Sequence, residues 1–128
     1  MKKSALQRRT LIKVRAKAWK RELDELCRRA CFARDQHRCQ KTGESTGLQW
    51  CHIRSRRYLS TRWRMENVLT LTAGQHLWWH HNPLAAALWF QEKFPDRARF
   101  LLLAQQTEHS FDREATKLYL QQELDKYA

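Results

Sequence analysis

Apolar side chains recur at steps of three and four residues through most of this chain, which is the spacing of one face of an α-helix. The longest such stretch covers residues 4–35, where neither Gly nor Pro interrupts the pattern. It predicts one long helix, or two helices in line, with Lys and Arg on the other faces. Three acidic residues near its middle are expected to pair with neighbouring turns of the same helix: Glu22, Asp24 and Glu25.

The pattern changes after residue 35. Following a turn-rich segment, residues 48–53 and 68–72 predict two short strands that pair antiparallel. Between them, residues 54–66 predict a basic loop, and residues 73–81 after the second strand predict a helix. This part of the chain therefore predicts a β-hairpin followed directly by a helix.

Three more helices are expected in the remaining sequence. Residues that favour helix starts mark them: Asn82 as N-cap and Pro83 at the first position before residues 84–94, Pro95 before residues 96–106, and Ser110 or Asp112 before a last helix that ends near Tyr127. The expected fold class is therefore α+β and mostly helical. A single domain is expected, made of a basic helical arm (residues 1–35), a core (36–82) and C-terminal helices (83–128).

The positive charge lies in one half of the chain. The net charge is +12, and residues 1–64 hold 19 Lys and Arg against 5 Asp and Glu, whereas residues 65–128 hold 6 against 8. A one-sided basic charge is typical of proteins that bind a polyanion, and DNA is the expected partner. No apolar run approaches the roughly 20 residues of a membrane span. No apolar segment follows the basic N-terminus, so a cytoplasmic protein without a membrane partner is expected.

Four histidine and asparagine positions stand out between residues 51 and 81. His76 and His80 are four residues apart on the expected helix, so their side chains share one face and can hold one metal ion. His52 ends the first expected strand, and a neutral His can act as a general base near pH 7. Asn67 has the chemistry to bond the backbone of the 54–66 loop and hold the ring of His52 in place.

These residues resemble the motif of the HNH endonucleases, also called ββα-metal or His-Me finger nucleases. The order Cys51-His52, then Asn67, then His76-x-x-x-His80 resembles the motif of the colicin-type DNases, which reads HH, then Asn, then H-x-x-x-H. Over about residues 30–95 the chain is also similar to small phage HNH proteins of the NinG-like kind, through ARDQHRCQKTG, CHIRSRRYLSTRWRMEN and NPLAAALWFQEKF. The resemblance implies a ββα-metal core and one divalent metal ion. It implies that Cys51, His76 and His80 occupy metal-ligand positions, His52 that of the general base and Asn67 that of the orienting residue.

Two departures from the family pattern concern cysteine. Many of the phage proteins hold the hairpin with a structural zinc on four Cys. Here only Cys39 remains, and other residues take the remaining positions: Thr42, Thr72 and Gln75. Cys51 stands where a harder ligand is usual, and a thiolate favours zinc over Mg²⁺. Alternatively Cys51 does not bind, and Mg²⁺, Mn²⁺ or Ni²⁺ sits on the two histidines and on substrate oxygens. Without an export signal the Cys are expected to be reduced, and Cys27 and Cys31 to be buried thiols.

Five arginines in the loop between the strands are expected to contact DNA: Arg54, Arg56, Arg57, Arg62 and Arg64. Arg56 and Arg62 match the arginines of the phage pattern. His81 lies about 100° round the helix from His80, which makes it a phosphate contact or a solvent-exposed residue. His37 and His109 have no partner in the sequence and are expected at the surface.

Two hypotheses follow. The first is a metal-dependent HNH endonuclease, encoded by a phage or prophage and active as a monomer or homodimer. It hydrolyses phosphodiester bonds in duplex or branched DNA, by nicking or double-strand cleavage, with weak sequence preference. The second is a nucleic-acid-binding module without catalysis, in which a structural zinc is closed by four side chains: Cys39, Cys51, His76 and His80.

Overall fold

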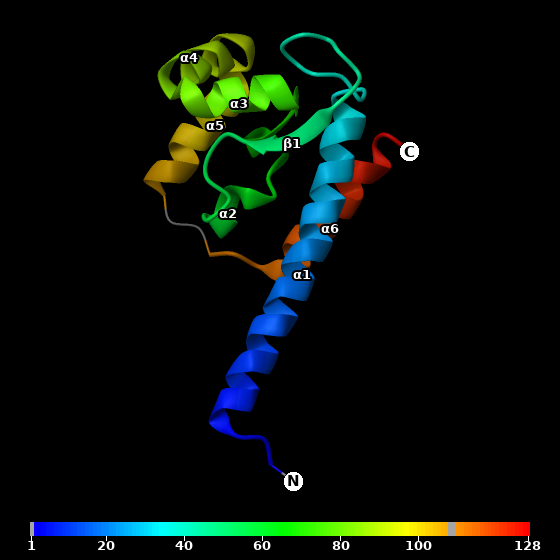
Figure 1. Ribbon diagram of the computed structural model, residues 1–128, viewed down its shortest axis with the longest axis vertical. Helices are drawn as coiled ribbons and strands as arrows, with labels where there is room; N and C mark the ends of the chain where they lie inside the picture. Colours follow the sequence, from blue (N-terminus) through cyan, green and yellow to red (C-terminus); the bar gives the residue numbers. More distant parts are fainter. Residues whose placement is uncertain (1, 108–109) are drawn as a thin grey trace.

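The computed structural model describes residues 2–107 and 110–128, and it is built around one long helix. Helix α1 (Ala5–Arg34) begins at Ser4, whose side chain and that of Gln7 form a reciprocal capping box. It ends at a turn in which Gln36 and His37 take positive φ angles of 57° and 52°. Its N-terminal half projects away from the rest of the chain as a straight rod (Figure 1). The sequence predicted one long helix or two helices in line over residues 4–35, and the structure shows one helix.

A two-stranded antiparallel sheet follows. Strand β1 (Leu48–His52) pairs with β2 (Val68–Thr72) in a register that sets His52 opposite Val68. The segment between the strands is not all loop, because it contains a short helix, α2 (Leu59–Arg62), and a 3₁₀ turn, η1 (Met65–Asn67). Helix α3 (Ala73–His81) begins directly after β2, where the Thr72 hydroxyl accepts a hydrogen bond from the backbone N–H of Gln75.

Three helices complete the described chain. Helices α4 (Pro83–Lys93) and α5 (Pro95–Gln106) each have Pro at their start, which removes a backbone N–H that would have no partner there. Helix α6 (Arg113–Asp125) is capped by the Asp112 carboxylate and runs beside the C-terminal half of α1 (Figure 1). His109 lies outside the described residues. Among the residues described, no helix is both long enough and apolar enough to cross a membrane.

The sheet lies between two apolar clusters. The first joins the C-terminal half of α1 to α6 and to the segment before β2, through buried residues that include Leu23, Cys27, Trp63 and Leu120. The second lies against α3 and α4 and includes Cys39, Cys51, Leu69 and Leu71. Cys27 and Cys31 are buried thiols, as expected. Because only the later half of α1 packs on these clusters, its earlier half remains exposed to solvent.

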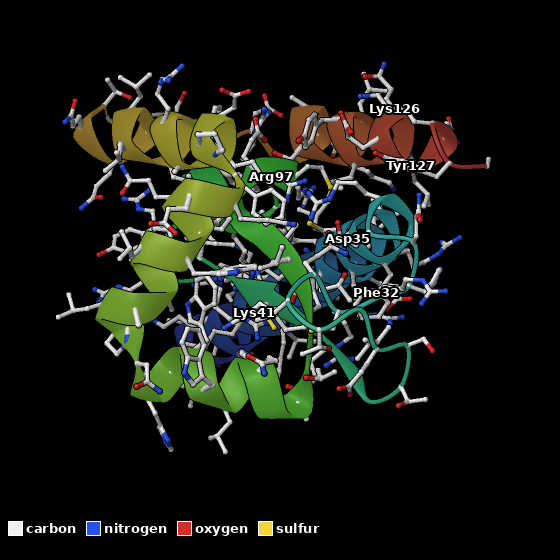
Figure 2. The ribbon with its side chains drawn as sticks, turned by 90° about the horizontal axis from the view of Figure 1, so that it is seen from above. Phe32, Asp35, Lys41, Arg97, Lys126 and Tyr127 are labelled. Carbon is white, nitrogen blue, oxygen red and sulfur yellow. The ribbon has the colours of Figure 1, made fainter. Side chains whose placement is uncertain are left out.

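A buried ion pair joins the end of α1 to the sheet. Arg34 Nε lies 2.8 Å from Asp35 Oδ1, and an Arg34 Nη2 atom donates to the carbonyl of Val68 at 2.7 Å. Asp35 Oδ2 accepts the backbone N–H of Thr70 at 3.0 Å. Figure 2 shows Asp35 inside the molecule, between α1 and the sheet. These contacts connect the C-terminal end of α1 to β2.

Candidate metal and catalytic site

An open cavity of about 460 Å³ lies where the end of β1 faces α3. It brings together three of the residues singled out by the sequence, His52, His76 and His80, with Arg56 at its wall. The remaining lining comes from apolar and small residues: Trp50, Ile53, Ser55, Trp79 and Pro83. Residues from the strand, the basic segment and the helix therefore meet at one place.

The two helix histidines face each other. The Nε2 atoms of His76 and His80 are 3.0 Å apart, and their ring centroids are 4.7 Å apart. On the other side of its ring, His76 Nδ1 lies 2.7 Å from Oε1 of Gln49 on β1. An amide oxygen only accepts hydrogen bonds, so His76 carries its proton on Nδ1 and turns the lone pair of Nε2 toward His80.

This arrangement fits two ligands of one metal ion. Bonds of about 2.0–2.1 Å place two ligand nitrogens about 2.9 Å apart at adjacent octahedral positions and about 3.3 Å apart at tetrahedral ones. Metal-binding histidines commonly donate their second N–H to an oxygen acceptor, which is the role Gln49 has here. Burial, together with the charge of His80, lowers the pKa of His76, so its lone pair is available at neutral pH.

Sequence reasoning missed Gln49. The signal that could have found it is its position on the first strand, on the same face as Cys51. Side chains alternate along a strand, so residues two apart point the same way. The Cys51 side chain, however, does not reach the histidine pair.

Cys51 is buried in the second apolar cluster instead. It is 4% exposed and packs with Cys39, Leu69 and Leu71, and its thiol donates to the Gln49 carbonyl at 3.5 Å. Burial raises the pKa of this thiol to about 12. Within residues 2–107 and 110–128, no group of three or more His, Cys, Asp or Glu side chains is arranged to hold a metal ion. Neither the three-ligand set with Cys51 nor the four-ligand zinc set that adds Cys39 is therefore assembled.

Hydrogen bonds surround Cys39. Burial raises the pKa of its thiol, but donors from the Thr42 side chain and the backbone of Thr72, Thr42 and Lys41 outweigh it and leave the pKa below its ordinary value. Lys41 in turn lies over the ring of Trp78, 3.4 Å from its centroid. Polar contacts and aromatic packing thus surround the Cys39 thiol.

His52 is held as a neutral base. Its Nε2 lies 3.0 Å from the backbone carbonyl of Arg62, so Nε2 donates and Nδ1 keeps the lone pair. Burial is the main cause that lowers the pKa of His52 to about 4, with the charge of Arg56 acting in the same direction. The ring also contacts Trp50, with centroids 4.3 Å apart. At neutral pH the imidazole is therefore unprotonated, and its Nδ1 can accept a hydrogen bond.

Asn67 fixes the backbone that follows His52. It is fully buried, its Oδ1 accepts the N–H of Arg54 at 2.7 Å, and its Nδ2 donates to the carbonyl of Arg54 at 3.1 Å. Its own carbonyl accepts the N–H of Ile53 at 2.9 Å. The expected bond to the loop backbone is present, and Asn67 acts on the chain beside His52 rather than on its ring.

Asp24 is the residue whose role the sequence concealed. Rather than pairing within α1, it accepts two bonds from Arg62 at 2.7 and 3.0 Å and one from the indole N–H of Trp63 at 2.7 Å. Arg56 adds a third partner at 3.1 Å. Because the Arg62 carbonyl holds His52, Asp24 supports the base through Arg62. Glu25 does pair locally, with Arg28.

The five arginines do not share one role. Arg62 is committed to Asp24, and Arg64 pairs with Glu66 while lying 4.2 Å from the ring centroid of Tyr119. Arg54 is half-buried over Tyr58. Arg56 and Arg57 are exposed, and Arg56 lines the cavity. Arg56 also pairs with Asp24, but 58% of its side chain is exposed, and the exposed Arg57 lies over the ring of Tyr58. DNA contact by these five arginines stays a prediction.

The comparisons with known proteins add no constraint. No protein-family model matches this chain, and neither curated proteins nor solved structures yield a match. The chemistry of the site therefore rests on the geometry above.

Proposed function

We propose that this protein is a metal-dependent endonuclease of the HNH kind, which hydrolyses phosphodiester bonds in DNA with weak sequence preference. One observation carries the proposal: the Nε2 atoms of His76 and His80 converge to 3.0 Å on the wall of a cavity that His52 also lines. A hairpin that leads directly into a helix supports a ββα-metal core, because it presents the base and both ligands from adjacent elements.

The roles follow from the protonation states. His52 takes the proton of a water molecule on Nδ1, while its Nε2–H remains bonded to the Arg62 carbonyl. His76 and His80 would hold one divalent ion, and imidazole suits Zn²⁺ or Ni²⁺ best. When bound, the ion supplies a Lewis acid for the phosphate and stabilises the leaving oxygen. Arg56, exposed at the cavity wall, offsets negative charge that develops on the phosphate.

DNA is the proposed substrate because the charge favours a polyanion. The net charge is +12, Arg56 lines the cavity, and the neighbouring Arg57 is exposed. Contacts of this kind recognise the phosphate backbone and carry little sequence information, so weak sequence preference is expected.

Plasmid cleavage tests the proposal. Supercoiled DNA is incubated with the protein and with Mg²⁺, Mn²⁺, Ni²⁺ or Zn²⁺, and the wild type is compared with His52→Ala and His80→Ala. Nicking that requires metal and is lost in both variants is the expected result. His81→Ala is the matched control. His81 is the exposed neighbour of His80, so its substitution is expected to leave the affinity for the metal ion unchanged.

Two results would overturn the proposal. One is the absence of cleavage with every metal although the protein is folded. The other is cleavage by His52→Ala at the wild-type rate, which would show that the neutral imidazole in the cavity is not the base.

A further inference from the structure

The first half of α1 carries basic side chains that form no ion pairs within the described part of the protein. Arg9, Lys13 and Lys17 are all exposed, and in the part of the chain that the structure describes none of them forms an ion pair or a side-chain hydrogen bond. They lie on the rod that projects from the body (Figure 1). No acidic residue precedes Glu22 in the sequence, so this segment has no counter-charge of its own.

These charges form a stripe that leads to the candidate site. At 100° per residue, Arg9, Lys13, Lys17 and Lys20 fall within an arc of about 80° on the helix, and Asp24 falls in the same arc. Asp24 binds Arg56 and Arg62, which adjoin His52. We define the phosphate stripe as Arg9, Lys13, Lys17 and Lys20. It therefore approaches the cavity along one side of α1.

The stripe, together with the turn that joins it to Asp24, matches a short run of duplex in length. Asp24 lies 15 positions after Arg9, a rise of about 22 Å at about 1.5 Å per residue. That distance equals about six base pairs at about 3.4 Å each. A straight, capped helix keeps this spacing constant, and so does a duplex. The two rods can therefore run alongside each other beyond the cavity.

We propose that the phosphate stripe binds the backbone of duplex DNA whose scissile bond lies in the cavity, so that the preferred substrate extends at least about six base pairs to one side of the cut. This inference rests on the proposed function. It names the substrate as a duplex because residues 5–18 hold no aromatic side chain on which unpaired bases could stack.

A second copy of the chain fits the arm less well. The arm also exposes Leu6, Ile12 and Val14. Leu6, Leu11 and Val14 line one open hollow near the start of the arm, and Ile12 points at least about 120° away from Leu6 and Val14. These side chains form no apolar face that runs the length of the arm. A helix that pairs with another helix requires such a face. The basic side chains of the arm lie on one side of the helix more regularly than its apolar side chains do, which favours DNA over a second copy of the chain as the partner.

Two charge-matched variants separate the stripe from general positive charge. Lys13→Gln/Lys17→Gln removes two charges of the stripe. Arg8→Gln/Arg15→Gln removes two charges on the same arm that point at least about 140° away from Lys13 and Lys17. Gln has a helix propensity close to that of Lys and Arg, so both variants should keep α1, which circular dichroism checks. Dissociation constants are measured by anisotropy in the His52→Ala background, with duplexes of about 24 and about 8 base pairs and a salt series.

The stripe variant is expected to bind the long duplex at least about tenfold more weakly at 0.1 M salt and to lower the salt slope by about 2. The control variant is expected to change affinity less than about threefold, and the short duplex to bind both variants alike. Equal losses in the two variants, equal binding of single strands and duplex, or a change in oligomeric state instead of affinity would overturn the inference. Failure of the proposed function would appear separately, as absence of cleavage by the wild type.

Discussion

The Asp24 cluster permits the sharpest stability prediction. The Asp24 side chain is 20% exposed, and it receives the guanidinium of Arg62, which is 14% exposed, and the indole of Trp63, which is 1% exposed. Asp24→Ala leaves both donors without their acceptor. An indole N–H without a partner costs about 1–2 kcal/mol. Breaking a well-buried ion pair costs about 3–5 kcal/mol, and partial exposure of this one reduces that to about 2 kcal/mol.

The free energy of unfolding should therefore fall by about 3 kcal/mol, which lowers the melting temperature by about 10 °C in a chain of this size. Urea denaturation followed by Trp fluorescence measures the change. Glu25→Ala is the matched control on the same helix. Its ion pair with Arg28 is exposed, so its removal should cost less than about 0.5 kcal/mol.

Asp24→Asn keeps one oxygen for the indole of Trp63 but loses the charge. Its cost in free energy of unfolding should therefore lie between those of Asp24→Ala and Glu25→Ala. Equal costs for Asp24→Ala and Glu25→Ala would refute the reasoning, because burial would then make no difference. A second readout is catalytic. Since Arg62 positions His52 through its carbonyl, cleavage by Asp24→Asn should decline more than metal affinity does.

Three further outcomes are expected. Gln49→Ala should weaken Ni²⁺ or Zn²⁺ binding by about tenfold or more in calorimetry, because His76 loses the acceptor that orients it; unchanged affinity would contradict that role. Cys51→Ala should leave metal affinity unchanged while lowering the free energy of unfolding by about 1–2 kcal/mol through lost packing; a loss of metal binding would restore the thiol as a ligand. The pKa of His52 is lowered from 6.5 to about 4. Between pH 6.5 and pH 4 the unfolded chain binds a proton at His52 that the folded protein does not. The free energy of unfolding should therefore decrease as the pH falls through this range, by at most about 3 kcal/mol. His52→Asn should flatten that dependence in urea titrations at several pH values, and an unchanged slope would show that another group is responsible.

The secondary structure was largely determined by local sequence. Apolar spacing without Gly or Pro predicted α1, and the bounds predicted for β2 and α3 agree with the structure. The His76 and His80 pair was also predictable, because helix geometry alone brings residues four apart together. The short helices between the strands were missed, since they hold only a few residues and their backbone conformation depends on Asp24 and Asn67.

The partners of individual side chains were decided only by tertiary structure. Strand alternation places Cys51 and His52 on opposite faces, but it does not say which face an apolar cluster will cover. Cys51 packs against Leu69 and Leu71 and so does not reach the histidine pair, whereas Gln49 accepts a hydrogen bond from His76 and orients its ring. The long-range pairing of Asp24 with Arg62 carries no local signal, because it joins residues 38 positions apart. Sequence thus determined which groups are available, and packing decided which of them meet.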